Sequence, residues 1–250
     1  MLQYRTNSLI KRIYFSLILS ILANNYLFSQ NQNNTFDINF KAKENFDKVY
    51  GKDPTLYNGL LYNTFYPGKV EGDQYFTNSN YQKGEVIIRG VKYNNIDLNF
   101  DIYKQVLLLK YLSSSNVYNV IEISKAWLES FSIGNYRFVL YGTPNTPQRF
   151  YQVLGNDSLL LFYFWKKELM SQNDYVGNTS YYFALTKEQN VLINNSLKKF
   201  NSNRSFIHLF VKQQQAHIKE YLRANKINVK NASDQTMEEL INYCSKISKI

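Results

Sequence analysis

Asp97, Asn99 and Asp101 stand at alternate positions in "NIDLNFDI", which is the spacing that opens a calcium-binding loop. Such a loop folds around its ion, usually with glycine at the sixth position and a bidentate glutamate at the twelfth. Here these two positions hold Ile102 and Leu108. On an extended strand, four residues span about 13 Å, so Asp97 and Asp101 could not share an ion there either. We therefore predict that this stretch is not a metal site.

Apolar side chains fill the other alternate positions of the same stretch: Ile96, Leu98, Phe100 and Ile102. A period of two is typical of a β-strand with one buried face, and a folded loop would not need it. The spacing therefore predicts a strand in which the four apolar side chains face the core. The polar side chains between them, Asp97, Asn99 and Asp101, are predicted to face water.

Few other residues have types and spacings that suit chemistry. His208 and His217 fall within one predicted helix, where nine residues place them about 180° apart, so they cannot bind one metal together. Cys244 is the only cysteine, which excludes an intramolecular disulfide, and its apolar neighbours at helical spacing predict a buried side chain. A carboxylate pair built from distant strands, as glycosidases use, stays open. We predict no catalytic residue, no metal site and no cofactor, and the sequence does not identify the ligand-binding residues.

The first 29 residues have the three parts of a signal peptide. Arg5, Lys11 and Arg12 precede an apolar run of eleven residues at 13–23, and a polar stretch follows. That run suits a signal-peptide core and is too short to span a bilayer. We predict export with cleavage after Ser29 and no transmembrane helix in the mature chain. The mature protein is then periplasmic, associated with the outer membrane or extracellular.

The mature chain is expected to be basic. Cleavage after Ser29 would remove three of the 29 lysine and arginine residues and none of the 19 acidic residues, so the net charge would fall from +10 to about +7. A basic exported protein suits an envelope protein, a glycan or lipopolysaccharide as its partner. Nucleic acid is not expected, because the sequence has no nucleic-acid-binding motif and export takes the chain out of the cytoplasm.

Residues 30–200 are predicted to form one β-domain. Short aromatic and β-branched runs alternate with turn residues at a spacing of about 8–12 residues, typical of antiparallel sheets. Examples are "LYNGLLYNTFY", "GEVIIRG", "SYYFALT" and "NVLINN", and Arg89-Gly90 suits a tight hairpin. Strands do not alternate with helices, which argues against a parallel sheet. We predict an α+β, mainly β protein with an antiparallel β-meander that forms a curved sheet or a partly closed barrel.

Residues 201–250 are predicted to be a helical segment packed on that sheet, because the hydrophobic period changes to about 3.6 after Phe200. One helix is expected in "SFIHLFVKQQQAHIKEYLRAN", with an apolar stripe made of Ile207, Phe210, Val211, Ile218, Tyr221 and Leu222. A second helix is expected from about Asp234, where Thr236 and Glu239 have the spacing of a capping box.

Several stretches resemble a recurring type of exported β-meander protein of Gram-negative bacteria. They are "LYNGLLYNTFYP", "KGEVIIRGVKYNNIDLNFDIYKQVLLL", "FYQVLGNDSLLLFYFWKK" and the C-terminal "MEELINYC". That type has a Y-N-G start, a G-x-V-x-Y-x-G-x-x-Y hairpin and an L-x-Y-D-like strand. This sequence departs from it, with Phe100 in the place of the tyrosine and Ile88 in the Y-x-G slot. The resemblance implies export and a β-meander, and it brings no established reaction or ligand.

We expect an exported, non-enzymatic protein that is a binding or structural component of the cell envelope. Its aromatic-rich sheet suits a protein partner or a small apolar or sugar ligand, and the side chains considered for stacking on a sugar are Tyr163, Trp165, Tyr181 and Tyr182. One alternative is a hydrolase of envelope glycans whose carboxylates come from distant strands. The other is an outer-membrane β-barrel, which two amphipathic C-terminal helices fit badly.

Overall fold

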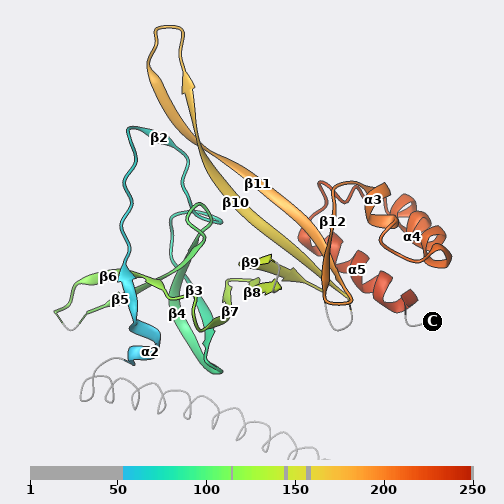
Figure 1. The fold of residues 1–250 in the computed structure, drawn as a ribbon, viewed down its shortest axis with the longest axis horizontal. Coiled ribbons are helices and arrows are strands. Elements are labelled where there is room, and N and C mark those ends of the chain that lie inside the picture. Colours follow the sequence, from blue (N-terminus) through green and yellow to red (C-terminus); the bar gives the residue numbers. More distant parts are fainter. Residues whose placement is uncertain (1–52, 114, 144–145, 156–158, 249–250) are drawn as a thin grey trace, which may run out of the picture. The chain divides into compact units, whose positions relative to one another are not determined.

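The computed structural model describes residues 53–113, 115–143, 146–155 and 159–248 (Figure 1). The predicted signal peptide and cleavage site lie outside these residues. The chain divides into two units after Pro54, and the architecture below is that of the second unit, Thr55–Ile250. Within the described residues, no helix is both long enough and apolar enough to cross a membrane.

In chain order, the helices and strands are α2 (Pro54–Tyr57), β1 (Gly59–Leu61), β2 (Val70–Glu71), β3 (Gln82–Ile88), β4 (Val91–Asp101), β5 (Val106–Leu112), β6 (Tyr118–Ile123), β7 (Leu128–Ile133), β8 (Tyr136–Thr143), β9 (Thr146–Leu154), β10 (Leu160–Asn173), β11 (Thr179–Ile193), β12 (Ser196–Phe200), α3 (Asn203–Ile207), α4 (Lys212–Ala224) and α5 (Asp234–Ser248). The strands form one sheet, and the helices after β12 pack on it. The predicted fold class, a mainly β protein with a curved antiparallel sheet and C-terminal helices, is confirmed.

The sheet consists of two successive meanders. Its order is β1-β6-β5-β4-β3-β7-β8-β9-β10-β11-β12, and only the short β2 pairs in parallel, with β11. Within the series β3 to β6, and within the series β7 to β12, strands that are consecutive in sequence pair with each other. The two series join where β7 pairs with β3 instead of with β6. The sheet is not closed, because β1 and β12 end the order.

The connection between β6 and β7 forces the sheet to curl. It has four residues, 124–127, although β5, β4 and β3 lie between these two strands in the sheet. Four inter-strand steps in a flat sheet cover about 19 Å, whereas five residue steps of extended chain reach only about 17 Å. Curling therefore brings β6 toward β7. Strands β3 to β9 accordingly all contribute to one hydrophobic core.

Four phenylalanines form the centre of that core. Phe131 and Phe138 are stacked with ring centroids 4.8 Å apart, and Phe100 meets both of them edge-on at 5.3 and 5.2 Å. Phe150 adds edge-on contacts to Phe100 at 5.5 Å and to Phe131 at 5.3 Å. Such pairs add about 0.5–1.5 kcal/mol each beyond the burial of their area.

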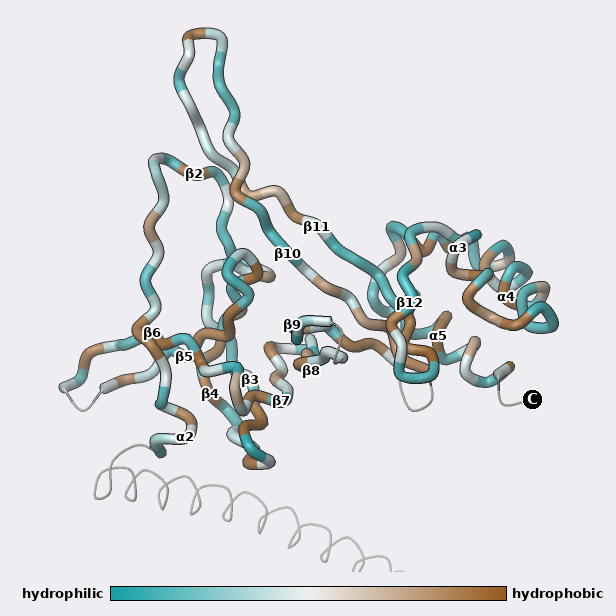
Figure 2. Tube along the Cα trace, in the orientation of Figure 1, coloured by the Kyte–Doolittle hydropathy of each residue, from teal (hydrophilic) through white to brown (hydrophobic). Residues whose placement is uncertain are grey.

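A second core lies between the strands from β10 onward and the C-terminal helices. It includes Tyr163, Phe206, Ile218, Leu222, Met237, Leu240, Ile241 and Cys244, all of them almost completely buried. Figure 2 shows hydrophobic and hydrophilic residues alternating along α4 and α5, as expected for helices with one buried face. The prediction that Cys244 is a buried side chain is confirmed.

Several predicted strand boundaries were wrong. "SYYFALT" and "NVLINN" belong to one continuous strand, β11. The stretch "LYNGLLYNTFY" forms a strand only at its three residues Gly59–Leu61, preceded by α2. The Arg89-Gly90 turn is confirmed, with φ of 51° and 74° in the two-residue connection between β3 and β4. Positive φ at both positions gives the hairpin turn whose twist matches the flanking strands.

The predicted first C-terminal helix is two helices. α3 ends at Ile207 with His208 as its C-cap, and α4 begins after Val211, whose backbone is extended. Two aromatic rings, Phe206 and Phe210, pack in series beside β12, with centroids 5.0 Å apart for Phe200–Phe206 and 5.3 Å apart for Phe206–Phe210.

Two details of the predicted helices also differ. Val211 was expected in the apolar stripe but is 60% exposed, because it lies in the interruption. α5 begins at Asp234, and its first turn is capped by Ser233, whose Oγ accepts a hydrogen bond from the N–H of Thr236 at 3.2 Å. Ser233, rather than Thr236, is therefore the capping residue.

Candidate functional site

The stretch "NIDLNFDI" lies in β4, and its apolar face is buried as predicted. Ile96, Leu98, Phe100 and Ile102 are all buried. The prediction for the polar face is correct only for Asp97, which is partly exposed and forms an ion pair with Lys83 at 2.9 Å. The prediction was wrong for Asn99 and Asp101, because these side chains are 2% and 0% exposed.

The buried Asp101 carboxylate accepts three hydrogen bonds. Its Oδ2 accepts from the Tyr62 hydroxyl at 2.6 Å, and its Oδ1 accepts from the backbone N–H groups of Tyr103 and Lys104, both at 2.8 Å. The Gln74 amide donates in turn to the Tyr62 hydroxyl at 3.0 Å. Burial raises the pKa of Asp101, while the hydrogen bonds from Tyr62 and from the two backbone groups act in the opposite direction. The network is structural, since it holds the turn after β4 in place.

Residues 74–78 run alongside the C-terminal end of β4 and bond to it. The N–H of Ile102 donates to the carbonyl of Gln74 at 3.0 Å, and the N–H of Phe76 donates to the carbonyl of Phe100 at 2.9 Å. Next to it, the Asn99 amide donates to the carbonyl of Asn78 at 3.0 Å. At its C-terminal end, β4 therefore buries Asn99 and Asp101 on the face for which the sequence pattern suggested water, while Asp97 stays partly exposed.

The described residues contain no group of three or more His, Cys, Asp and Glu side chains that could hold a metal ion. In particular, Asp97 and Asp101 do not face a common space. Asp97 forms an ion pair with Lys83, whereas Asp101 is buried and hydrogen-bonded to Tyr62. His208 and His217 do not share a helix as predicted, since His208 caps α3 and His217 lies in α4.

The aromatic side chains considered for sugar stacking do not form a surface. Tyr163 is 0% exposed inside the second core, and Lys187 covers its ring with the ammonium 4.6 Å from the centroid. Trp165 is half-buried and donates through Nε1 to the side chain of Gln152 at 2.6 Å. Tyr181 is partly buried and Tyr182 is 36% exposed, and both lie in the outer half of β11, away from that core.

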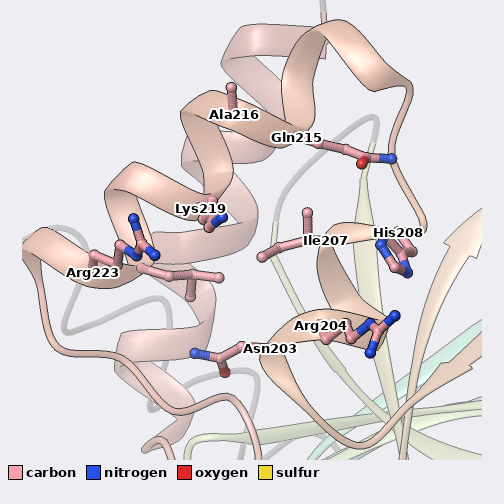
Figure 3. A pocket seen from close by; sticks show the side chains of 9 residues that line it. Asn203, Arg204, Ile207, His208, Gln215, Ala216, Lys219 and Arg223 are labelled. Atoms are coloured by element: carbon pink, nitrogen blue, oxygen red, sulfur yellow. The ribbon is translucent and has the colours of Figure 1, made fainter.

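A pocket of about 620 Å³ opens between α3 and α4 (Figure 3). Its lining residues are Asn203, Arg204, Ile207, His208, Gln215, Ala216, Lys219, Leu222 and Arg223. Arg204 and His208 lie four residues apart on α3 and its C-cap, and Lys219 and Arg223 lie four residues apart on α4. Each helix thus presents a pair of nitrogen-bearing side chains to the same space.

The pocket lining contains no carboxylate. The ion pairs found within the described residues involve none of Arg204, Lys219 and Arg223. Like charges four residues apart on a helix are destabilising by about 0.2–0.5 kcal/mol. An anion in this pocket would therefore meet donors that are not already paired with an acid.

The polar amides of the lining have structural roles that fix the pocket walls. Asn203 donates to the carbonyl of Ile227 at 2.7 Å and accepts from the N–H of Val229 at 2.8 Å, so it ties the start of α3 to the chain after α4. Gln215 donates to the carbonyl of Phe210 at 2.8 Å, across the interruption between the helices. These bonds leave the charged side chains as the free donors of the site.

Sequence reasoning missed this pocket because it treated α3 and α4 as one helix. On a continuous helix, Arg204 and Arg223 would lie about 28 Å apart along the axis and could not line one site. The two four-residue spacings of basic residues were visible, but the fold-back at residues 208–211 was not.

In comparisons with known proteins, no family model, no curated protein and no solved structure matches this chain.

Proposed function

We propose that this is an exported, non-enzymatic binding protein of the cell envelope that holds an anionic group of its ligand in the α3–α4 pocket. One observation carries the proposal: Arg204, Lys219 and Arg223 line a single pocket that contains no carboxylate. Guanidinium groups bind phosphate and carboxylate through paired, charge-assisted hydrogen bonds. The expected net charge of the mature chain, about +7, adds a longer-range attraction for anions.

The size of the pocket and the apolar part of its lining limit the class of ligand that it can hold. About 620 Å³ is in the range of small-ligand sites, so a phosphate-bearing or carboxylate-bearing head group fits and a folded protein does not. Ile207, Ala216 and Leu222 provide an apolar part of the lining. The chemistry suits an anion attached to a less polar group, as in the head group of an anionic phospholipid or lipopolysaccharide.

The same features favour binding over hydrolysis. A glycan hydrolase needs two carboxyl groups about 5–10 Å apart on either side of the scissile bond. The pocket lining offers none, and the most buried carboxylate of the sheet, Asp101, is 0% exposed and cannot meet a polymer. The glycan-hydrolase alternative therefore has less structural support than the binding role.

The test compares two double variants that lose the same charge. Arg204→Gln/Arg223→Gln empties the pocket of its guanidinium groups, and Lys69→Gln/Lys198→Gln removes two exposed charges elsewhere. Binding to inorganic pyrophosphate is measured by calorimetry. Binding to neutral phospholipid vesicles, with and without an anionic phospholipid, is measured by sedimentation.

We expect the pocket variant to bind at least about tenfold more weakly, because each hydrogen bond to a charged group contributes about 1.5–3 kcal/mol. The control variant should stay within about twofold at physiological salt, where exposed charges are screened. Equal losses in the two variants would mean that binding follows net charge alone and would contradict the proposal. Unchanged binding in both variants would also contradict the proposal.

A further inference from the structure

Strands β10 and β11 extend as a two-stranded hairpin past their neighbours in the sheet (Figure 1). On the outer side of β10, pairing with β9 ends at Tyr163, and the last contact is the N–H of Lys167 donating to the carbonyl of Ile102 at 3.2 Å. From residue 168 to residue 173, β10 has a partner only on the β11 side among the described residues.

The unpaired groups of this edge can be assigned from the alternation of the strand. In an antiparallel pair, successive residues point their N–H and C=O groups alternately to one side and the other. Since Lys167 bonds on the outer side, Leu169, Ser171 and Asn173 direct their N–H and C=O groups outward as well. These groups offer a template for one more extended strand.

The edge lacks the features that normally protect such a template. Exposed edges usually carry lysine, proline or a bulge, which prevent pairing with another chain. Residues 169–186 contain neither lysine nor proline, and their one charged side chain is Asp174. That carboxylate is engaged in the hairpin turn, where it accepts from the N–H groups of Val176 at 2.9 Å and Asn178 at 2.8 Å.

We propose that this edge pairs with the same edge of a second copy of the chain, so that two hairpins form a four-stranded antiparallel sheet. Only an extended strand can use the outward groups, and a two-fold axis beside Ser171 would place Leu169 of each copy opposite the partner's Asn173. The exposed Met170 and Tyr182, which are cross-strand neighbours on one face, extend the contact.

The charge distribution of the chain favours a second copy over other occupants. The whole chain carries 29 basic and 19 acidic residues, a net charge of +10, so two copies repel each other overall. The stretch 169–186 has no basic residue, and it is therefore a place where two copies can approach without that repulsion. For the same reason it offers nothing to attract an anionic surface. This pairing does not depend on the anion pocket.

The test uses two lysine substitutions that add the same charge to the two strands of the hairpin. Ser171→Lys places like charges side by side at the expected two-fold axis, where they disfavour pairing. Ser180→Lys places its charge on β11, at a position that is also exposed. Sedimentation equilibrium of the mature protein measures the dimer dissociation constant, and circular dichroism confirms the fold of each variant.

We expect a reversible wild-type dimer with a dissociation constant of roughly micromolar to tens of micromolar, because the contact is smaller than a standard interface of about 1,600 Å². Ser171→Lys should weaken it at least tenfold, and Ser180→Lys should change it less than about twofold. The proposal would be overturned by a wild-type protein that stays monomeric at millimolar concentration, or by a dimer that both lysines affect equally.

A cysteine pair tests the register independently. The native Cys244 is buried, so Ser171→Cys introduces the reactive thiol. Opposed residues of an antiparallel pair have Cα atoms about 5.5 Å apart, within disulfide range. Mild oxidation should therefore link Ser171→Cys into a dimer much faster than Ser180→Cys. Equal rates of linking, or monomeric protein that binds neutral vesicles through the hairpin tip, would contradict the pairing.

Discussion

The hydrogen bond between Tyr62 and the buried carboxylate of Asp101 should contribute measurably to stability. In Asp101→Asn, the amide oxygen can still accept from the backbone N–H groups of Tyr103 and Lys104, but the Tyr62 hydroxyl loses its acceptor. Losing a hydrogen bond to a charged group costs about 1.5–3 kcal/mol. Because burial of the charge offsets part of this at neutral pH, we expect a loss near the lower end, about 1.5 kcal/mol.

Four further variants separate the contributions. Asp101→Ala also orphans the two backbone N–H groups at about 1 kcal/mol each, so the loss should reach about 3–5 kcal/mol. Tyr62→Phe removes the same side-chain bond as Asp101→Asn, and the double variant should therefore fall short of the sum by about 1 kcal/mol. Asp97→Asn is the matched control, because this partly exposed carboxylate has only a surface ion pair and should matter by no more than about 0.5 kcal/mol.

The assay is urea unfolding followed by tryptophan fluorescence, with calcium and with a chelator. The order of the variants should be the same in both solutions, and the chelator should leave the wild-type midpoint unchanged. If Asp101→Asn unfolds like Asp97→Asn, the network is not stabilising and the reasoning fails. A wild-type midpoint that rises with calcium would restore the metal-site interpretation that the sequence disfavoured.

The pH dependence gives a second signature of the same carboxylate. Burial raises the pKa of Asp101 above the ordinary value of 3.8. Asp101 then binds its proton more tightly in the folded state than in the unfolded state. The resulting stabilisation is fully present below about pH 3.8 and is lost as the pH rises through the pKa of Asp101 in the folded state. Asp101→Asn lacks this group, so the stability difference between wild type and variant should be larger near pH 4 than at pH 7.

Three other predictions concern the core, the thiol and the leader. Phe100→Ala should destabilise the protein by about 3–5 kcal/mol in urea melts, because the ring is 1% exposed among three other phenylalanines; a loss under 1 kcal/mol would contradict that packing. Burial raises the pKa of Cys244 to about 12, so a thiol reagent at pH 8 should label it only after unfolding, and rapid labelling of the folded protein would refute this. Intact mass of protein recovered from the envelope or medium should begin after Ser29, whereas full-length chain in the cytoplasm would exclude export.

The sequence pattern predicted one face of β4 well and the other badly, for a physical reason. A period of two tells which side chains share a face, so Leu98 and Phe100 were assigned together to the core. It does not tell whether another part of the chain covers the opposite face. Tyr62, which seals Asp101, is thirty-nine residues away in sequence. Burial by such distant segments leaves no local signal.

The length of β11 was missed for a related reason. Lys187 and Glu188 are charged residues that lie between the two stretches predicted as separate strands. In the fold they pair with Trp165 and Phe164 of β10, and the Lys187 ammonium lies over the Tyr163 ring. A long charged side chain can thus occupy a strand interior when its stem packs on an aromatic neighbour. The α3–α4 pocket depended on another feature that the hydrophobic pattern did not reveal, the fold-back at residues 208–211.

The short connection between β6 and β7 has a consequence for the order in which the protein folds. The hairpins β3–β4, β4–β5 and β5–β6 pair neighbours in sequence and can form early, because the loops that they close are short. β7 can reach β3 only after these strands have assembled and curled, so the β3–β7 ladder should form late. Substitutions in that ladder, such as at Phe131, are then expected to accelerate unfolding more than they slow refolding. The seam between the two meanders would thus set the lifetime of the folded state.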